Sequence, residues 1–119
     1  MVVEITDIVS KKEFYNLVGD IGGTNARFAI VSKGSSELIS IKTLQCEKFE
    51  TIQQAIQFYQ SSIEDIQISS ACIASAGTVH LDTFKPSNND WVINKSEVLS
   101  VLNNIQVSWI NDFNAQALA

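Results

Sequence analysis

A polar turn that interrupts one apolar stretch constrains the fold of this chain most strongly. In the segment LVGDIGGTNARFAIV, apolar residues flank a polar insert that runs from Gly19 to about Asn25. Apolar runs on both sides of such an insert are typical of buried β-strands. The sequence therefore predicts two strands, 15–20 and 26–32, joined by a tight turn whose ligand is the first question.

The rest of the chain continues with one more strand and then alternates helices and strands. Short turns between the first three strands predict an antiparallel meander, and a helix between two strands predicts a parallel crossover. We therefore predict an α/β fold with a five-stranded mixed sheet in the order βββαβαβ and a further helix from Phe113. The other predicted segments are an N-terminal arm over 1–13, a strand over 38–44, a helix over 52–63, a strand over 68–76, a small hairpin or irregular excursion over 78–94, a helix capped by Asn94 and a strand over 105–110.

Composition narrows the class of protein. The chain has 119 residues, of which 45% are hydrophobic and 18% are charged, which is typical of a soluble globular domain. A net charge of −5 argues against a nucleic-acid partner, because few Lys and Arg are available to neutralise phosphates. The sequence shows neither a secretion signal nor a membrane span, so we expect a cytoplasmic protein. Cys46 and Cys72 lie in apolar stretches and are predicted to be reduced, buried core thiols.

The polar turn has the composition of a phosphate-binding loop. Backbone N–H groups at Gly22 and Gly23 can approach an anion closely, and Thr24 adds a hydroxyl. The turn is neither a P-loop, which needs Gly-Lys followed by Ser or Thr, nor a Rossmann turn, which leads into a helix. Asp20 beside a phosphate would be repulsive unless a cation lay between them, which favours Mg²⁺. The alternative is an ordinary hairpin whose glycines adopt positive φ.

A second polar pair follows the last predicted strand. Asn111 and Asp112 stand where ligands collect in open α/β sheets, at the carboxyl end of a parallel strand. Asp112 alone is explained more simply as the cap of the following helix. Combined with a phosphate loop and Mg²⁺, it becomes a general base for phosphoryl transfer.

Four segments together resemble a known family. LVGDIGGTNARFAI, a strand ending in Ala-Gly at Gly77, SNNDWVIN and WINDFNAQALA resemble the N-terminal part of bacterial glucokinases, which have the actin-like ATPase (ribonuclease H-like) fold. The sequence departs from the family at Ser87, where the family has threonine, and at Thr78, where it usually has proline. The resemblance implies that 14–119 is the N-terminal lobe of a two-lobed sugar kinase whose C-terminal lobe this chain lacks, and that the lobe alone is folded but inactive.

The resemblance also implies an activity and its site. The activity is phosphorylation of the glucose 6-hydroxyl by ATP with Mg²⁺. The resemblance leaves open whether the full-length protein forms a homodimer. Two alternatives stay open as well: a sugar- or nucleotide-sensing relative without chemistry, and a kinase for another hexose such as mannose or an N-acetylated amino sugar. The implied residues are Asp112 as catalytic base, Asn111, Asn88, Asn89 and Trp91 for the sugar, Gly19, Asp20, Ile21, Gly22, Gly23 and Thr24 as the ATP phosphate loop, and Asp20 for Mg²⁺ through water.

Overall fold

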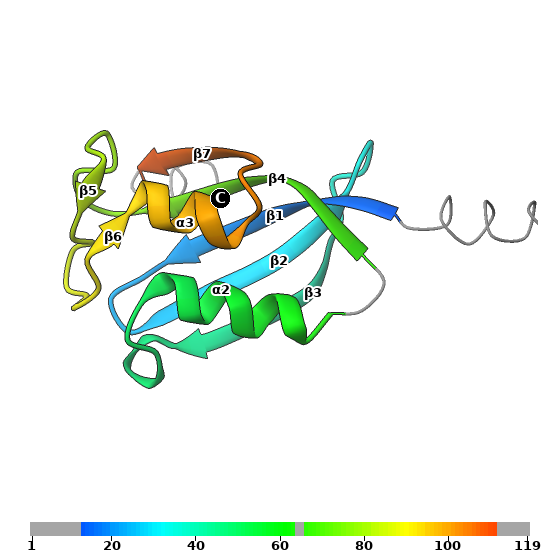
Figure 1. Ribbon diagram of the computed structural model, residues 1–119. Helices are drawn as coiled ribbons and strands as arrows, with labels where there is room; N and C mark the ends of the chain where they lie inside the picture. Colours follow the sequence, from blue (N-terminus) through cyan, green and yellow to red (C-terminus); the bar gives the residue numbers. More distant parts are fainter. Residues whose placement is uncertain (1–12, 64–65, 112–119) are drawn as a thin grey trace, which may run out of the picture.

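A computed structural model describes residues 13–63 and 66–111 of the chain (Figure 1). The order of elements in these ranges confirms the predicted βββαβαβ arrangement, with a two-strand hairpin in the expected excursion. Asp112, the helix expected from Phe113 and the N-terminal arm lie outside the described residues, except that Glu13 begins the first strand. The elements are β1 (Glu13–Ile21), β2 (Asn25–Ser32), β3 (Leu38–Gln45), the 3-10 turn η1 (Cys46–Lys48), α2 (Ile52–Ser61), β4 (Ile66–Ser75), β5 (Thr83–Phe84), β6 (Ile93–Asn94), α3 (Lys95–Val101) and β7 (Gln106–Asn111).

The main sheet has the strand order β3-β2-β1-β4-β7. β2 pairs antiparallel with both β1 and β3, whereas β4 pairs parallel with both β1 and β7. These pairings confirm the predicted meander and the two predicted parallel crossovers. β1, β4 and β7 therefore end at the same edge of the sheet, beside the β5–β6 hairpin (Figure 1).

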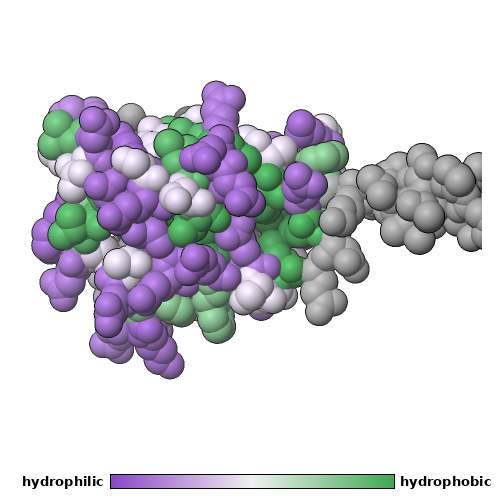
Figure 2. Space-filling view, viewed as in Figure 1, coloured by the Kyte–Doolittle hydropathy of each residue, from purple (hydrophilic) through white to green (hydrophobic). Residues whose placement is uncertain are grey.

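Both helices cover the same face of the sheet, and each begins at a side-chain cap (Figure 1). Thr51 Oγ1 accepts the N–H of Gln54 at 3.2 Å before α2, and Asn94 Oδ1 accepts the N–H of Glu97 at 3.2 Å before α3. Each cap satisfies a backbone N–H that has no partner within its helix. Figure 2 shows a mostly hydrophilic surface on this side, which fits helices whose apolar faces are turned toward the sheet.

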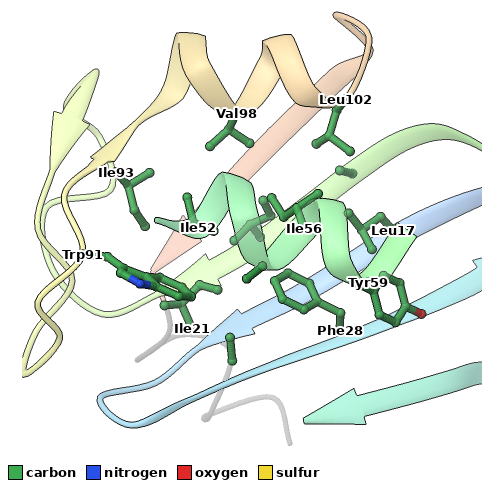
Figure 3. Packing of buried hydrophobic residues seen from close by; sticks show 14 of the residues in the cluster. Leu17, Ile21, Phe28, Ile52, Ile56, Tyr59, Trp91, Ile93, Val98 and Leu102 are labelled. Carbon is green, nitrogen blue, oxygen red and sulfur yellow. The ribbon is translucent and has the colours of Figure 1, made fainter. Parts of the chain in front are cut away.

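The hydrophobic core fills the space between these helices and the sheet (Figure 3). The rings of Phe28 and Tyr59 pack with their centroids 5.6 Å apart. Tyr59 is fully buried, and its hydroxyl donates a hydrogen bond to the carbonyl oxygen of Ser40 at 2.8 Å. Its burial raises the pKa of Tyr59 to about 12. Other fully buried side chains of the core are Leu17, Ile21, Ile30, Ile52, Ile56, Ile73, Ile93, Val98 and Leu102.

The two cysteines are free, but only one of them is a core residue. Cys46 is buried, as expected, whereas Cys72 is only partly buried, so the expectation of two core thiols is wrong for Cys72. Alternation along β4 explains the difference, because Ala71 and Ile73 point into the core and Cys72 points to the opposite face.

Lys95 at the start of α3 links the β5–β6 hairpin to the sheet. Its ammonium group lies 5.9 Å from the centre of the Phe84 ring and 5.8 Å from that of Trp109, and it donates to the carbonyl oxygen of Val79. The centroids of the Phe84 and Trp109 rings lie 5.6 Å apart, and the rings pack edge to face.

Within the described ranges, no helix is long and apolar enough to cross a membrane.

Candidate functional site

The glycine loop, which we define as Gly22–Thr24, connects β1 to β2 at the carboxyl edge of the sheet. The N–H of Gly22 donates to the carbonyl oxygen of Asn25 at 2.9 Å, and the carbonyl oxygen of Thr24 accepts the N–H of Cys46 at 2.9 Å. Gly23 and Thr24 are exposed. Among the described residues, no hydrogen bond takes up the N–H of Gly23. The donors of the loop that remain open to a ligand are therefore at Gly23 and Thr24.

The glycines of this loop allow a close approach of neighbouring backbone and do not adopt unusual backbone angles. Positive φ occurs at Gly34 and Gly77 among the described glycines, and not at Gly22 or Gly23. A Cβ on Gly22 would lie 3.1 Å from the carbonyl oxygen of Asn25, and one on Gly23 would lie 3.1 Å from that of Asn88. The alternative of an ordinary hairpin with glycines at positive φ is therefore wrong for these two positions.

The strand before the loop places its predicted site residues in two different environments. Gly19 and Ile21 belong to the buried face of β1, and a Cβ on Gly19 would touch the ring of Phe28. Asp20 is exposed and stands opposite Arg27 in the register of β1 and β2. The described residues contain no group of three or more His, Cys, Asp or Glu that could hold a metal ion. A single exposed carboxylate still fits Mg²⁺, which keeps several waters and needs few protein ligands.

The predicted sugar-binding segment 88–91 packs directly against the glycine loop. Asn88 is exposed and has a φ of 58°, a left-handed conformation that asparagine tolerates. Asn89 is 3% exposed, and its side-chain nitrogen donates to the carbonyl oxygen of Gly22 at 2.8 Å and to the sulfur of Cys46 at 3.3 Å. Its side-chain oxygen accepts the N–H of Trp91 at 2.8 Å. The Asn89 side chain therefore has protein partners on both of its polar atoms.

Trp91 is also a buried residue with an internal partner. It is 3% exposed, and its indole N–H donates to the carbonyl oxygen of Phe49 at 2.9 Å. Figure 3 shows its ring beside Ile21 and below Ile52, within the core. Direct contacts of Asn89 and Trp91 with a sugar stay predictions, and the observed role of both side chains is to hold neighbouring segments together.

A cavity of about 450 Å³ lies between the glycine loop and this segment. Three of its described lining residues are acidic and none is Lys or Arg. Such a lining repels a phosphate group, so a phosphate bound by Gly23 and Thr24 would approach them from outside the cavity. The lining residues are Gly23, Thr24, Cys46, Glu47, Phe49, Glu50, Asn88, Asn89, Asp90 and Trp91.

The segment around η1 also lines the cavity, a role that the sequence did not indicate. Cys46, Glu47 and Phe49 enter the cavity wall, and Cys46 contacts both Thr24 and Asn89. Burial raises the pKa of the Cys46 thiol, while the hydrogen bond from Asn89 partly opposes this rise. No local pattern marks these residues, because their role depends on partners far away in the sequence.

The end of β7 lies at the same level of the sheet as the start of the glycine loop. Ile21 pairs with Ser75, and Ser75 pairs with Asn111. Because neighbouring strands lie about 4.8 Å apart, the ends of β1 and β7 are roughly 10 Å apart. The Asn111 amide nitrogen donates to the carbonyl oxygen of Gly77 at 3.3 Å. Asp112 follows directly but lies outside the described residues, so its role as base stays a prediction.

Comparisons with known proteins agree with one another. The family model described as Glucokinase matches residues 17–119. The glucokinase of Hahella chejuensis is 42% identical over 107 residues, which cover 90% of this chain and 33% of that protein. The glucokinase of Brucella abortus is 40% identical over 115 residues, which cover 97% of this chain and 34% of that protein. The chain thus spans about a third of the length of the curated relatives it matches.

The solved structures give the same result for the fold. The crystal structure of a glucokinase from an Antarctic psychrotroph superimposes with a TM-score of 0.76 at 32% identity, over 85% of this chain and 33% of that chain. A glucokinase from Balamuthia mandrillaris in complex with glucose has a TM-score of 0.69 at 23% identity, over 95% of this chain and 33% of that one, which supports the fold alone. With the mixed sheet described above and the family match over 17–119, the chain belongs to the glucokinase family and has the actin-like ATPase fold.

Proposed function

We propose that the whole protein to which this chain belongs transfers the γ-phosphoryl group of ATP to the 6-hydroxyl of glucose. The observation that supports this most is the register of the strands. Ile21, which precedes the glycine loop on β1, and Asn111 at the end of β7 both pair with Ser75 of β4. Two strand ends about 10 Å apart can hold the two halves of one phosphoryl-transfer site. We place the reaction in the cytoplasm.

In this proposal the two polar ends have different tasks. Asp112 accepts the proton of the 6-hydroxyl while that oxygen attacks the γ-phosphorus. The bond from this phosphorus to the oxygen that bridges it to the β-phosphate breaks, and ADP leaves with the bond's electron pair. Asn111 and the exposed Asn88 bind sugar hydroxyls, and Trp91 supports the wall behind them.

Gly23 and Thr24 supply the N–H groups and the hydroxyl that bind the phosphates, because the N–H of Gly22 already has a partner. Such fixed donors stabilise the charge that develops during transfer. When bound, Mg²⁺ neutralises part of the phosphate charge, and the exposed carboxylate of Asp20 would hold it through water.

ADP formation by the whole protein tests this proposal. We expect ADP only when glucose is present with Mg²⁺ and ATP, and an Asp112→Asn variant that lowers kcat by about 100- to 10,000-fold. Asp82→Asn, which changes an exposed carboxylate in the same way, is the matched control and should keep wild-type kcat. Normal turnover by Asp112→Asn would remove the base assignment.

The same assay separates the alternatives. A faster reaction with mannose or an N-acetylated amino sugar would change the acceptor but keep the reaction. Stabilisation of the wild-type protein by a sugar, without any ADP formation, would replace the kinase by a sensing relative. Either result would overturn the proposed glucose kinase activity.

A further inference from the structure

The side chain of Asn89 is hydrogen-bonded to the backbone of the glycine loop. It is 3% exposed, and its side-chain nitrogen lies 2.8 Å from the carbonyl oxygen of Gly22, although the two residues are 67 positions apart in sequence. The same nitrogen donates to Cys46, whose own N–H holds the carbonyl oxygen of Thr24. One buried amide therefore connects both carbonyl contacts that fix the loop to the rest of the domain.

This contact determines the direction of a possible phosphate donor. The C=O of Gly22 and the N–H of Gly23 belong to one planar trans peptide, so they point in opposite directions. When Asn89 draws the Gly22 carbonyl toward itself, the N–H of Gly23 points away from Asn89. No hydrogen bond within the described part of the chain occupies this N–H. The orientation of that donor is thus coupled to the position of the Asn89 amide.

Both N–H donors of the Asn89 side chain are already taken by hydrogen bonds within the protein. An asparagine side chain offers two N–H donors, and these serve Gly22 and Cys46. Its oxygen accepts the N–H of Trp91, which closes a turn two residues long. Lys85 donates to the backbone carbonyl of Asn89 and secures the turn from the other side. A sugar hydroxyl would have to displace one of these partners to gain a donor from Asn89.

We propose that Asn89 is a positioning residue for the ATP phosphate loop and not a residue that contacts the sugar. The inference rests on the proposed kinase function for the identity of the ligand. The geometry of the Asn89 contacts stands independently of that function. It predicts that losing the Asn89 donors disturbs binding of MgATP more than binding of glucose.

Kinetics of the whole protein test this with Asn89→Asp. The aspartate has the same shape and keeps an acceptor for Trp91, but it has no donor for Gly22. It also adds a negative charge to the acidic cavity lining, so the uncharged Asn89→Ser must show the same effect. The buried hydrogen bond to Gly22 is lost, so we expect the KM for MgATP to rise about tenfold, which corresponds to about 1.4 kcal/mol. The KM for glucose should stay within about twofold of wild type. Asn103→Asp makes the same change at an exposed asparagine that does not line the cavity, and it is the control.

Asn89→Ser serves as a second variant in case the aspartate prevents folding. A serine hydroxyl can still accept the N–H of Trp91 in the equivalent turn, but it is too short to reach Gly22. A larger rise in the KM for glucose than in the KM for MgATP would assign Asn89 to the sugar and overturn the inference. Unchanged values for both substrates would overturn it as well.

Hydrogen exchange of the loop separates this inference from the proposed function. In the whole protein without ligands, amide exchange in the peptide that spans 19–28 should become at least about tenfold faster in Asn89→Ser than in wild type. Unchanged exchange would overturn the role of Asn89 even if the protein is a kinase. Faster exchange in a protein that forms no ADP would keep that role and remove the kinase activity alone.

Discussion

Replacing Gly19 by alanine tests whether this glycine serves packing in β1. A Cβ at this position would lie 3.0 Å from Cε1 and 3.1 Å from Cδ1 of Phe28, whereas carbon atoms normally pack at about 3.5–4.0 Å. The Phe28 ring would have to move by roughly 0.5 Å. It is 1% exposed and packs on Tyr59, so it has little room to do so.

The expected loss of stability follows from two opposing contributions. Burial of one more methyl group stabilises the folded state by about 0.8 kcal/mol. Overpacking of a filled core costs about 1–3 kcal/mol, so we expect a net decrease of about 0.2–2 kcal/mol in the free energy of unfolding. Urea-induced unfolding followed by circular dichroism measures this decrease.

A double-mutant cycle with Phe28→Leu isolates the proposed clash. Leucine lacks Cε1, the nearer of the two ring carbons, and its smaller Cδ groups can rotate away from the new Cβ, so Gly19→Ala should cost less than about 0.5 kcal/mol in that background. The coupling energy between the two positions should therefore be about 1 kcal/mol. Equal costs in both backgrounds, or a stabilising effect of Gly19→Ala, would refute this account of the glycine.

Two further predictions concern stability. Thr51→Ala removes the side-chain cap of α2 and should lower the free energy of unfolding by about 1 kcal/mol. The control Gln57→Ala, at an exposed position of the same helix, should change it by less than about 0.5 kcal/mol. Equal effects of the two variants in urea titrations would contradict a stabilising role of the Thr51 cap. Because burial raises the pKa of Tyr59 to about 12, above its ordinary value near 10, the folded state keeps this proton longer than the unfolded state. Stability should therefore fall as the pH rises from about 10 to 12, and Tyr59→Phe should remove part of this dependence, which unfolding curves at several pH values can show.

The fold was predictable because its determinants are local. Apolar runs define β1 and β2, the spacing of Ile52, Ala55, Ile56 and Tyr59 defines α2, and Asn94 marks the start of α3. A helix between two strands then fixes parallel pairing, since a crossover is the ordinary connection for it. Each of these patterns is formed by residues that lie close together in the sequence.

The internal structure of the site could not be predicted in the same way. Asn89 reaches Gly22 across 67 residues, and Trp91 reaches Phe49 across 42. The resemblance singled out Asn89 as a sugar-binding residue, but the sequence could not show that its amide is buried and paired with Gly22 and Cys46. The tight space beside Gly23 likewise comes from the backbone of Asn88 and not from the turn itself.

β4 contributes no residue to the candidate site, but it sets the relative position of the two strands that do, β1 and β7. β4 separates β1 from β7, and its last residue, Ser75, pairs with both Ile21 and Asn111. Because side chains alternate between the two faces of a sheet, a shift of β7 by one residue would turn Asn111 to the opposite face. In the proposed site, the register of β4 therefore sets the position of Asn111 relative to the glycine loop, although the last side chains of β4, Ala74 and Ser75, are themselves buried.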